Sequence, residues 1–159
     1  FLHLNIYAEG RDELRRNSPV LKVPVLVDGD RELYDSRVIA RYLAAQHGTG
    51  PLTWEQENQL TLIDGANDSC VTLLLSKKSG LDVDADLEFW NLQRERIMAT
   101  MRTLNAMVEA GEFRDWNYPA VCLYCLVDWM DFREVASLLT FRDHNRQQPG
   151  VADTDPRLA

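Results

Sequence analysis

Apolar and polar residues alternate at the start of the chain, where every second residue from Leu2 onward is apolar. This period of two predicts a strand over residues 1–7. A polar stretch over residues 9–17 follows, and Ser18 and Pro19 close it as a turn or as the end of a short helix. The chain is therefore expected to open with a strand and a short polar segment.

A second strand-like run over residues 23–27 has valines on both sides of Pro24. The sequence Asp-Gly-Asp at residues 28–30 predicts a tight hairpin turn into a short partner strand at residues 32–34. A proline inside such a run removes a ladder hydrogen bond and normally confines the strand to an edge. A cis peptide bond just before the strand compensates for this, because it turns the chain sharply and exposes the preceding backbone groups.

From residue 36 onward the apolar positions recur every three or four residues, which predicts amphipathic helices. The expected helices run from the cap Ser36 to Gly48, from the capping box of Thr53 and Gln56 onward, from about Asp84 to Ala110, from Asn117 and Pro119 through Trp129, and over residues 133–146. The apolar stripe on the second of these contains Leu60, Ile63, Asn67, Cys70, Val71 and Leu74. The fourth is apolar almost all round, which predicts a central position.

The best linker candidate is the glycine- and proline-containing segment at residues 48–51, and no strand pattern follows it. We therefore expect two domains, one over residues 1–48 with two or three strands and one over residues 49–159 built from four or so helices. The last residues, 147–159, are predicted to form a polar tail.

Composition narrows the possible functions. Hydrophobic residues make up 45% of the chain, which is enough for a core. No run approaches the roughly 18 apolar residues of a membrane-spanning helix, so no membrane role is expected. The formal net charge of −8 disfavours binding to nucleic acid. Three cysteines, an odd number, fit a reducing compartment, so we expect a cytoplasmic protein.

The segment LKVPVLVDGDRELYDSRVIARYL at residues 21–43 resembles the signature of the glutathione transferase superfamily. Members have a cis-proline before a strand and then an acidic or amide residue followed by serine at a helix start, as Pro24, Asp35 and Ser36 are placed here. The segments LIDGANDSCVTLL, FWNLQRERI and CLVDWMDFR are similar to later helices of bacterial, cytosolic members. The resemblance implies an α+β, mostly helical fold: a partial thioredoxin-like domain followed by an all-helical domain.

The resemblance also implies a site for glutathione as cosubstrate. The backbone of Val23, before the cis-proline Pro24, would pair with the cysteinyl unit of glutathione. Ser36 at a helix N-terminus would bind the glutamyl carboxylate, Asp35 the glutamyl ammonium, and Lys22 would lie near the glycyl carboxylate. On local grounds alone, Ser36 is equally explained as a helix cap and Asp35 as a partner of the helix dipole.

No residue of the chain is a convincing catalytic group. The resemblance implies a further strand and helix before Phe1, and the turn between them would carry the residue that activates the sulfur. Tyr7 and Tyr34 are interpreted as packing residues. Histidines at positions 3, 47 and 144 lie too far apart in sequence to suggest a metal site.

Cys122 and Cys125 form a C-x-x-C pair inside an apolar helical segment, where cysteine is expected to pack as a small hydrophobe. Asp128 lies among apolar residues and needs hydrogen-bond donors, for which helix-end N–H groups or Arg133 are candidates. Three polar residues are expected on or beside the apolar stripe of the first long helix: Asp64, Asn67 and Asp68. The larger aromatic residues are expected mostly in the core: Trp54, Trp90, Trp116, Tyr124 and Trp129.

Two functions follow as expectations. The first is a homodimeric glutathione transferase that binds glutathione and transfers its thiol to a small apolar electrophile. The alternative is a non-catalytic protein of the same fold that serves as a binding or interaction scaffold, similar to the stringent starvation proteins. Retention of Asp35 and Ser36 favours the first, because a scaffold needs no glutamyl clamp, whereas the absence of the first strand and helix favours the second. A third expectation is that the chain is the retained part of a longer enzyme.

Overall fold

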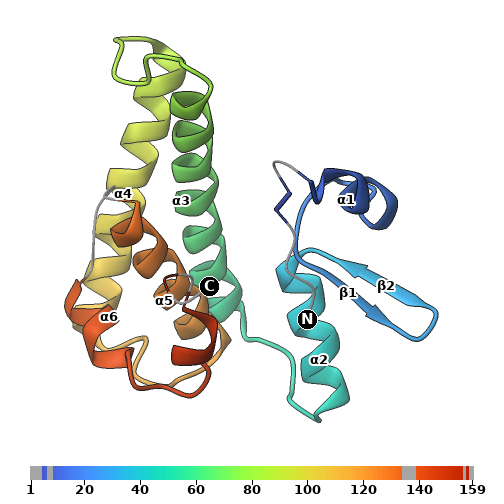
Figure 1. The fold of residues 1–159 in the computed structure, drawn as a ribbon. Coiled ribbons are helices and arrows are strands. Elements are labelled where there is room, and N and C mark those ends of the chain that lie inside the picture. The colour runs from blue at the N-terminus through green and yellow to red at the C-terminus, as the bar shows by residue number, and fades with distance from the viewer. Residues whose placement is uncertain (1–4, 7–8, 134–138, 156, 158–159) are drawn as a thin grey trace. The chain divides into compact units, whose positions relative to one another are not determined.

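A computed structural model describes residues 5–6, 9–133, 139–155 and 157 of the chain, with side chains left undescribed at 139–140 (Figure 1). The chain divides into two compact units, Phe1–Leu52 and Thr53–Ala159. The described residues are mostly helical with one small sheet, and this confirms the predicted fold class.

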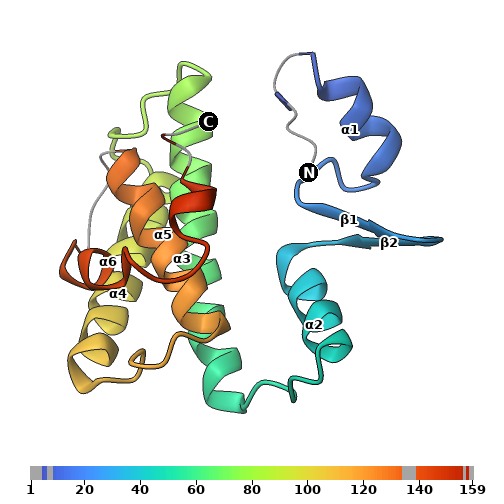
Figure 2. The same ribbon diagram turned by 60° about the horizontal axis from the view of Figure 1, so that its bottom comes forward.

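The first unit contains a β-hairpin between two helices, α1 (Arg11–Asn17) and α2 (Ser36–Gln46) (Figures 1 and 2). The hairpin joins β1 (Val25–Asp28) to β2 (Arg31–Tyr34) in antiparallel register. Gly29 has φ of +58°, a left-handed conformation that glycine tolerates well at the first central position of a two-residue hairpin turn.

The second unit is a helical bundle whose described helices are α3 (Trp54–Lys78), α4 (Glu88–Ala110), α5 (Tyr118–Phe132) and α6 (Leu139–Asn145), followed by a short 3-10 turn, Ala152–Thr154. α3 and α4 pair as a long hairpin, and α5 packs against α3 and α6 (Figure 2). None of the described helices is long and apolar enough to cross a bilayer.

Local capping explains where two of these helices begin. Thr53 and Gln56 form the predicted capping box: the Thr53 hydroxyl accepts from the Gln56 N–H at 3.3 Å, and the Gln56 side chain accepts from the Thr53 N–H at 3.0 Å. The Asn117 side chain accepts from the Ala120 N–H at 3.1 Å, as predicted for α5.

The main core lies in the second unit. α5 supplies much of it, with Ala120, Leu123 and Val127 fully buried, and this confirms its predicted central position. In the first unit, Leu14 is the only described apolar residue that is buried, and α2 buries none of its residues. The two units are therefore packed to very different degrees.

Several expected boundaries differ from the structure. α4 begins at Glu88 rather than near Asp84, because Arg94 donates to the carbonyl oxygens of Val83 and Ala85 and holds that segment as an irregular loop. The expected strand over residues 1–7 falls mostly outside the described residues, and Asn5 and Ile6, which are described, belong to no strand. The helix expected over residues 133–146 includes positions outside the described residues, and its described part is α6.

The aromatic residues mostly confirm the expected core, with one exception. Trp90 and Tyr124 are buried, and Trp116 and Trp129 pack against the core. Trp54 is 83% exposed, so its assignment to the core was wrong. It is the first residue of α3, directly after the cap Thr53.

On α3 the predicted apolar stripe is confirmed at Leu60, Ile63 and Cys70, whereas Asn67, Val71 and Leu74 are only half-buried. Asp64 is half-buried and Asp68 exposed.

Candidate functional site

The register of the β-hairpin brings two distant segments together at its open end. Val25 pairs with Tyr34, so Pro24 and Asp35 each lie one residue beyond the last pair of the ladder. Directly opposed residues of an antiparallel pair lie about 4.5–5.5 Å apart. The open end of the hairpin therefore places Val23 and Pro24 beside Asp35 and Ser36.

The peptide bond between Val23 and Pro24 is cis, as predicted. Val23 is 52% exposed and precedes the first residue of β1 by two positions, so its backbone lies outside the ladder of the hairpin. A peptide N–H and C=O placed in this way can pair with the backbone of an extended peptide ligand.

Ser18 fixes the backbone before this bond, a role that the sequence analysis missed. The buried Ser18 hydroxyl accepts from the Lys22 N–H at 3.1 Å and donates to the Lys22 carbonyl oxygen at 2.9 Å. Leu21, between them, has φ of +54°. A serine followed by proline signals a turn in the sequence, but nothing local reveals a hydroxyl that closes a loop four residues later.

Asp35, rather than Ser36, caps α2. Its Oδ1 accepts from the Arg37 N–H at 2.9 Å, and Ser36 is the first helical residue. The assignment of Ser36 as the cap was therefore wrong by one position. Both residues are exposed, and they lie at the N-terminus of α2, which is the positive end of the helix dipole.

The backbone of Asp35 has φ of +74° and ψ of 134°. Residues with a side chain rarely adopt this conformation, and it costs on the order of 1–3 kcal/mol. Such strain concentrates at functional sites. The observed outlier thus supports a functional role for the turn between β2 and α2.

A tyrosine ties the hairpin to α2. The Tyr42 hydroxyl donates to Oδ2 of Asp28, and this bond is the largest cause of a raised Tyr42 pKa. The Arg31 guanidinium lies 5.9 Å from the centre of the Tyr42 ring. These contacts join the turn end of the hairpin to α2, which begins at the open end of the hairpin. The spacing of these residues in the sequence did not predict the contacts.

The predicted binding residues, Lys22, Val23, Pro24, Asp35 and Ser36, thus gather at one end of the hairpin, with Lys22 exposed. They provide the Val23 peptide backbone, which lies outside the hairpin ladder, a carboxylate, a hydroxyl, a helix N-terminus and an ammonium group. This arrangement suits a small peptide that carries both an ammonium and carboxylate groups. Among the described residues, no group of three or more His, Cys, Asp or Glu side chains could hold a metal ion.

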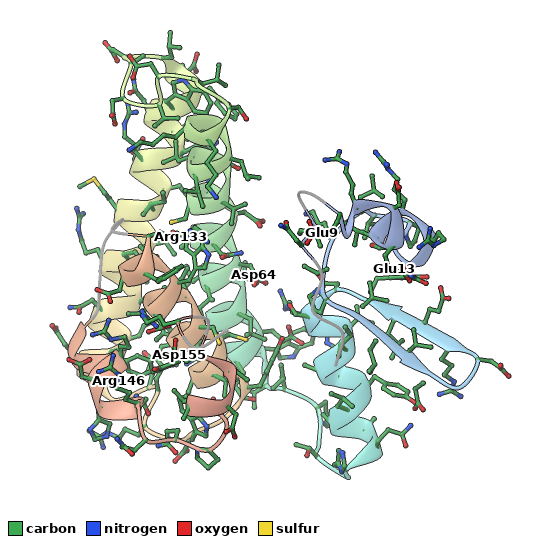
Figure 3. All side chains as sticks on the ribbon, in the orientation of Figure 1. Glu9, Glu13, Asp64, Arg133, Arg146 and Asp155 are labelled. Carbon is green, nitrogen blue, oxygen red and sulfur yellow. The ribbon has the colours of Figure 1, made fainter. Side chains whose placement is uncertain are left out.

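A second polar cluster lies in the helical unit and includes Asp155, which Figure 3 labels. Buried Asp128 accepts from Nη1 of Arg157 at 2.8 Å, so its partner is Arg157 and not the expected Arg133. Arg157 also contacts Asp155 at 3.2 Å. This cluster joins the C-terminal segment to α5, and we interpret it as structural.

Comparison with known protein families gives a match for the first unit. The family profile described as "Glutathione S-transferase, N-terminal domain" matches residues 2–51. No curated protein sequence matches the chain.

Solved structures resemble the whole chain. A glutathione transferase family member from Pseudomonas fluorescens Pf-5, with bound glutathione, superposes with a TM-score of 0.75 at 26% identity, over 96% of this chain and 82% of that one. The same protein with bound S-(propanoic acid)-glutathione gives a TM-score of 0.68 at 26% identity, over 85% and 77%. Glutathione S-transferase 1-6 from Anopheles dirus species B gives 0.71 over 96% and 79%, and at 15% identity it shows the fold alone.

Proposed function

Since the chain belongs to the glutathione transferase superfamily, we propose that it binds glutathione at the open end of its hairpin and transfers the glutathione thiol to an electrophilic small molecule. The observation that carries this proposal is the hairpin register, which joins a cis-proline and a helix N-terminus in one exposed site. The bound glutathione in the Pseudomonas fluorescens relative supports the choice of ligand.

Each part of glutathione has a partner in this site. The cysteinyl unit pairs with the Val23 N–H and C=O, and this leaves its sulfur beside the cis-proline. The glutamyl carboxylate binds the Ser36 hydroxyl and N–H, where the helix dipole adds favourable charge. The glutamyl ammonium pairs with the carboxylate of Asp35, and Lys22 approaches the glycyl carboxylate.

The division of labour between the units belongs to the same proposal. Residues 1–48 bind glutathione, and residues 49–159 hold a small apolar electrophile. We further propose that the protein acts in the cytoplasm as a homodimer. Among the described residues we assign none as the group that activates the sulfur.

Calorimetric titration of the chain with glutathione tests the binding site. Ser36→Ala removes a hydrogen bond to a charged group, worth about 1.5–3 kcal/mol, so the affinity should fall by roughly 10- to 150-fold. Ser79→Ala, at an exposed helix end in the other unit, is the matched control and should bind as the unaltered chain does.

The alternative function is a scaffold that does not bind glutathione. It is favoured if neither the unaltered chain nor Ser36→Ala gives a heat of binding. Equal affinity of the two proteins would instead place glutathione elsewhere and would refute the proposed site.

A further inference from the structure

The C-x-x-C pair on α5 has no part in the proposed function, and its surroundings differ from those expected. Cys125 is exposed and Cys122 is half-buried, while Leu123, Tyr124 and Leu126 turn into the core. The prediction that both cysteines pack as small hydrophobes therefore holds for Cys122, which contacts the core, and fails for Cys125.

The two thiols lie on one face of the helix. Residues three apart on an α-helix are neighbours on its surface. Helix geometry puts their Cα atoms about 5 Å apart. That Cα separation falls inside the range of about 4.4–6.8 Å that a disulfide requires. The Cβ atoms of such a pair lie about 5–6 Å apart and must approach to about 3.5–4.5 Å, so closing the disulfide between Cys122 and Cys125 requires a local shift of the α5 backbone.

We propose that Cys122 and Cys125 form a redox-active dithiol that closes to an intrahelical disulfide by exchange with a small disulfide such as glutathione disulfide. Cys125 is the entry thiol, because solvent reaches it, and Cys122 is the resolving thiol.

The exchange balances without a further oxidant. The Cys125 thiolate attacks one sulfur of glutathione disulfide, whose S–S bond breaks to release one glutathione. The Cys122 thiolate then attacks the Cys125 sulfur of the mixed disulfide and releases a second glutathione. The two protein thiols are oxidised to a disulfide, glutathione disulfide is reduced to two thiols, and the protons pass from the cysteines to the released thiolates.

Partial desolvation by the packed atoms around the thiol and, secondarily, the negative charge of Asp128 raise the pKa of Cys125 above that of an ordinary thiol, although its side chain is exposed at the surface. Only a small fraction is thiolate at neutral pH, so exchange is slow there. The rate should rise steadily with pH from pH 7 to 9, because the thiolate fraction does.

Cys70, the remaining one of the three cysteines, serves as an internal control. Cys70 is 1% exposed, and burial raises its pKa to about 11. It is therefore expected to remain a thiol under conditions in which the other two react.

The test is incubation of the full chain with excess glutathione disulfide at pH 8.5, acid quenching and intact-mass analysis with peptide mapping. The unaltered chain and Cys70→Ser should lose two hydrogen atoms, with the disulfide mapped to Cys122 and Cys125. Cys122→Ser should stop at a stable glutathione adduct on Cys125, and Cys125→Ser should stay unmodified.

A stable adduct on Cys125 of the unaltered chain, or three intact thiols, would overturn the proposal. Far-ultraviolet circular dichroism checks that each serine variant is folded. If Cys122→Ser is not, Cys122→Ala replaces it and should trap the same adduct.

Discussion

Asp35 combines three properties in one residue: a helix cap, an exposed carboxylate and a backbone conformation that is costly for any residue with a side chain. The cap alone explains why an aspartate is favoured before α2. It does not explain the positive φ, since a residue in ordinary extended conformation caps equally well. The strain is consistent with a turn shaped for the ligand rather than for stability alone.

Two substitutions of Asp35 separate its contribution to stability from its contribution to binding. Asp35→Ala loses the cap and keeps the strain, so α2 should be destabilised by about 1 kcal/mol. Asp35→Gly also loses the cap, at a cost of only a few tenths of a kcal/mol, and relieves about 1 kcal/mol of strain, so α2 should be as stable as before or more so.

Hydrogen exchange of the α2 amides measures the stability, and calorimetry measures glutathione binding. Both variants should bind about tenfold more weakly, because both lack the carboxylate. Undiminished binding by Asp35→Gly would show that the carboxylate makes no contact with the ligand.

At the scale of elements, the sequence predicted what local chemistry decides. The helix starts at Thr53 and Asn117, the hairpin turn and the cis bond at Pro24 are all confirmed, because each depends on residues within a few positions of one another. The binding residues were found through the resemblance, and their role in binding stays a prediction.

Contacts between distant segments could not be predicted in the same way. Asp128 was recognised as a carboxylate in need of donors, but its partner Arg157 lies 29 residues later. The residue pattern of one helix indicates that a carboxylate is buried. It does not indicate which distant segment supplies the hydrogen-bond donor. The hydroxyl of Ser18 and the bond from Tyr42 to Asp28 were missed for the same reason.

The contact between α5 and the C-terminal segment leads to a prediction at this scale. Arg157→Gln removes the charged donor from buried Asp128 and should destabilise the second unit by about 1.5–3 kcal/mol. Urea denaturation followed by tryptophan fluorescence measures this, because all four tryptophans lie in that unit. Arg102→Gln, an exposed arginine on α4, should change the stability by less than about 0.5 kcal/mol. Equal effects of the two substitutions would show that the ion pair contributes nothing specific.

For the molecule as a whole, the burial of apolar side chains is divided unequally between the two units. Leu14 is the one buried apolar residue among those described in the first unit, whereas α3, α4 and α5 together enclose an extended core in the second. Burial of apolar surface is the main favourable contribution to folding. Apolar burial therefore contributes much less to the free energy of unfolding of the first unit than to that of the second.

We accordingly predict two separate transitions in urea. Amides of β1, β2 and α2 should lose hydrogen-exchange protection at lower urea than the midpoint reported by tryptophan fluorescence, which follows only the second unit. Glutathione at 100 times Kd should raise the free energy of unfolding of the first unit by about 2.7 kcal/mol and so move its transition to higher urea. The transition of the second unit should stay unchanged if the ligand contacts the first unit alone. Ser36→Ala should largely abolish that shift. A single coincident transition for both probes would mean that the units unfold together and that the second unit supplies the stability the first one lacks.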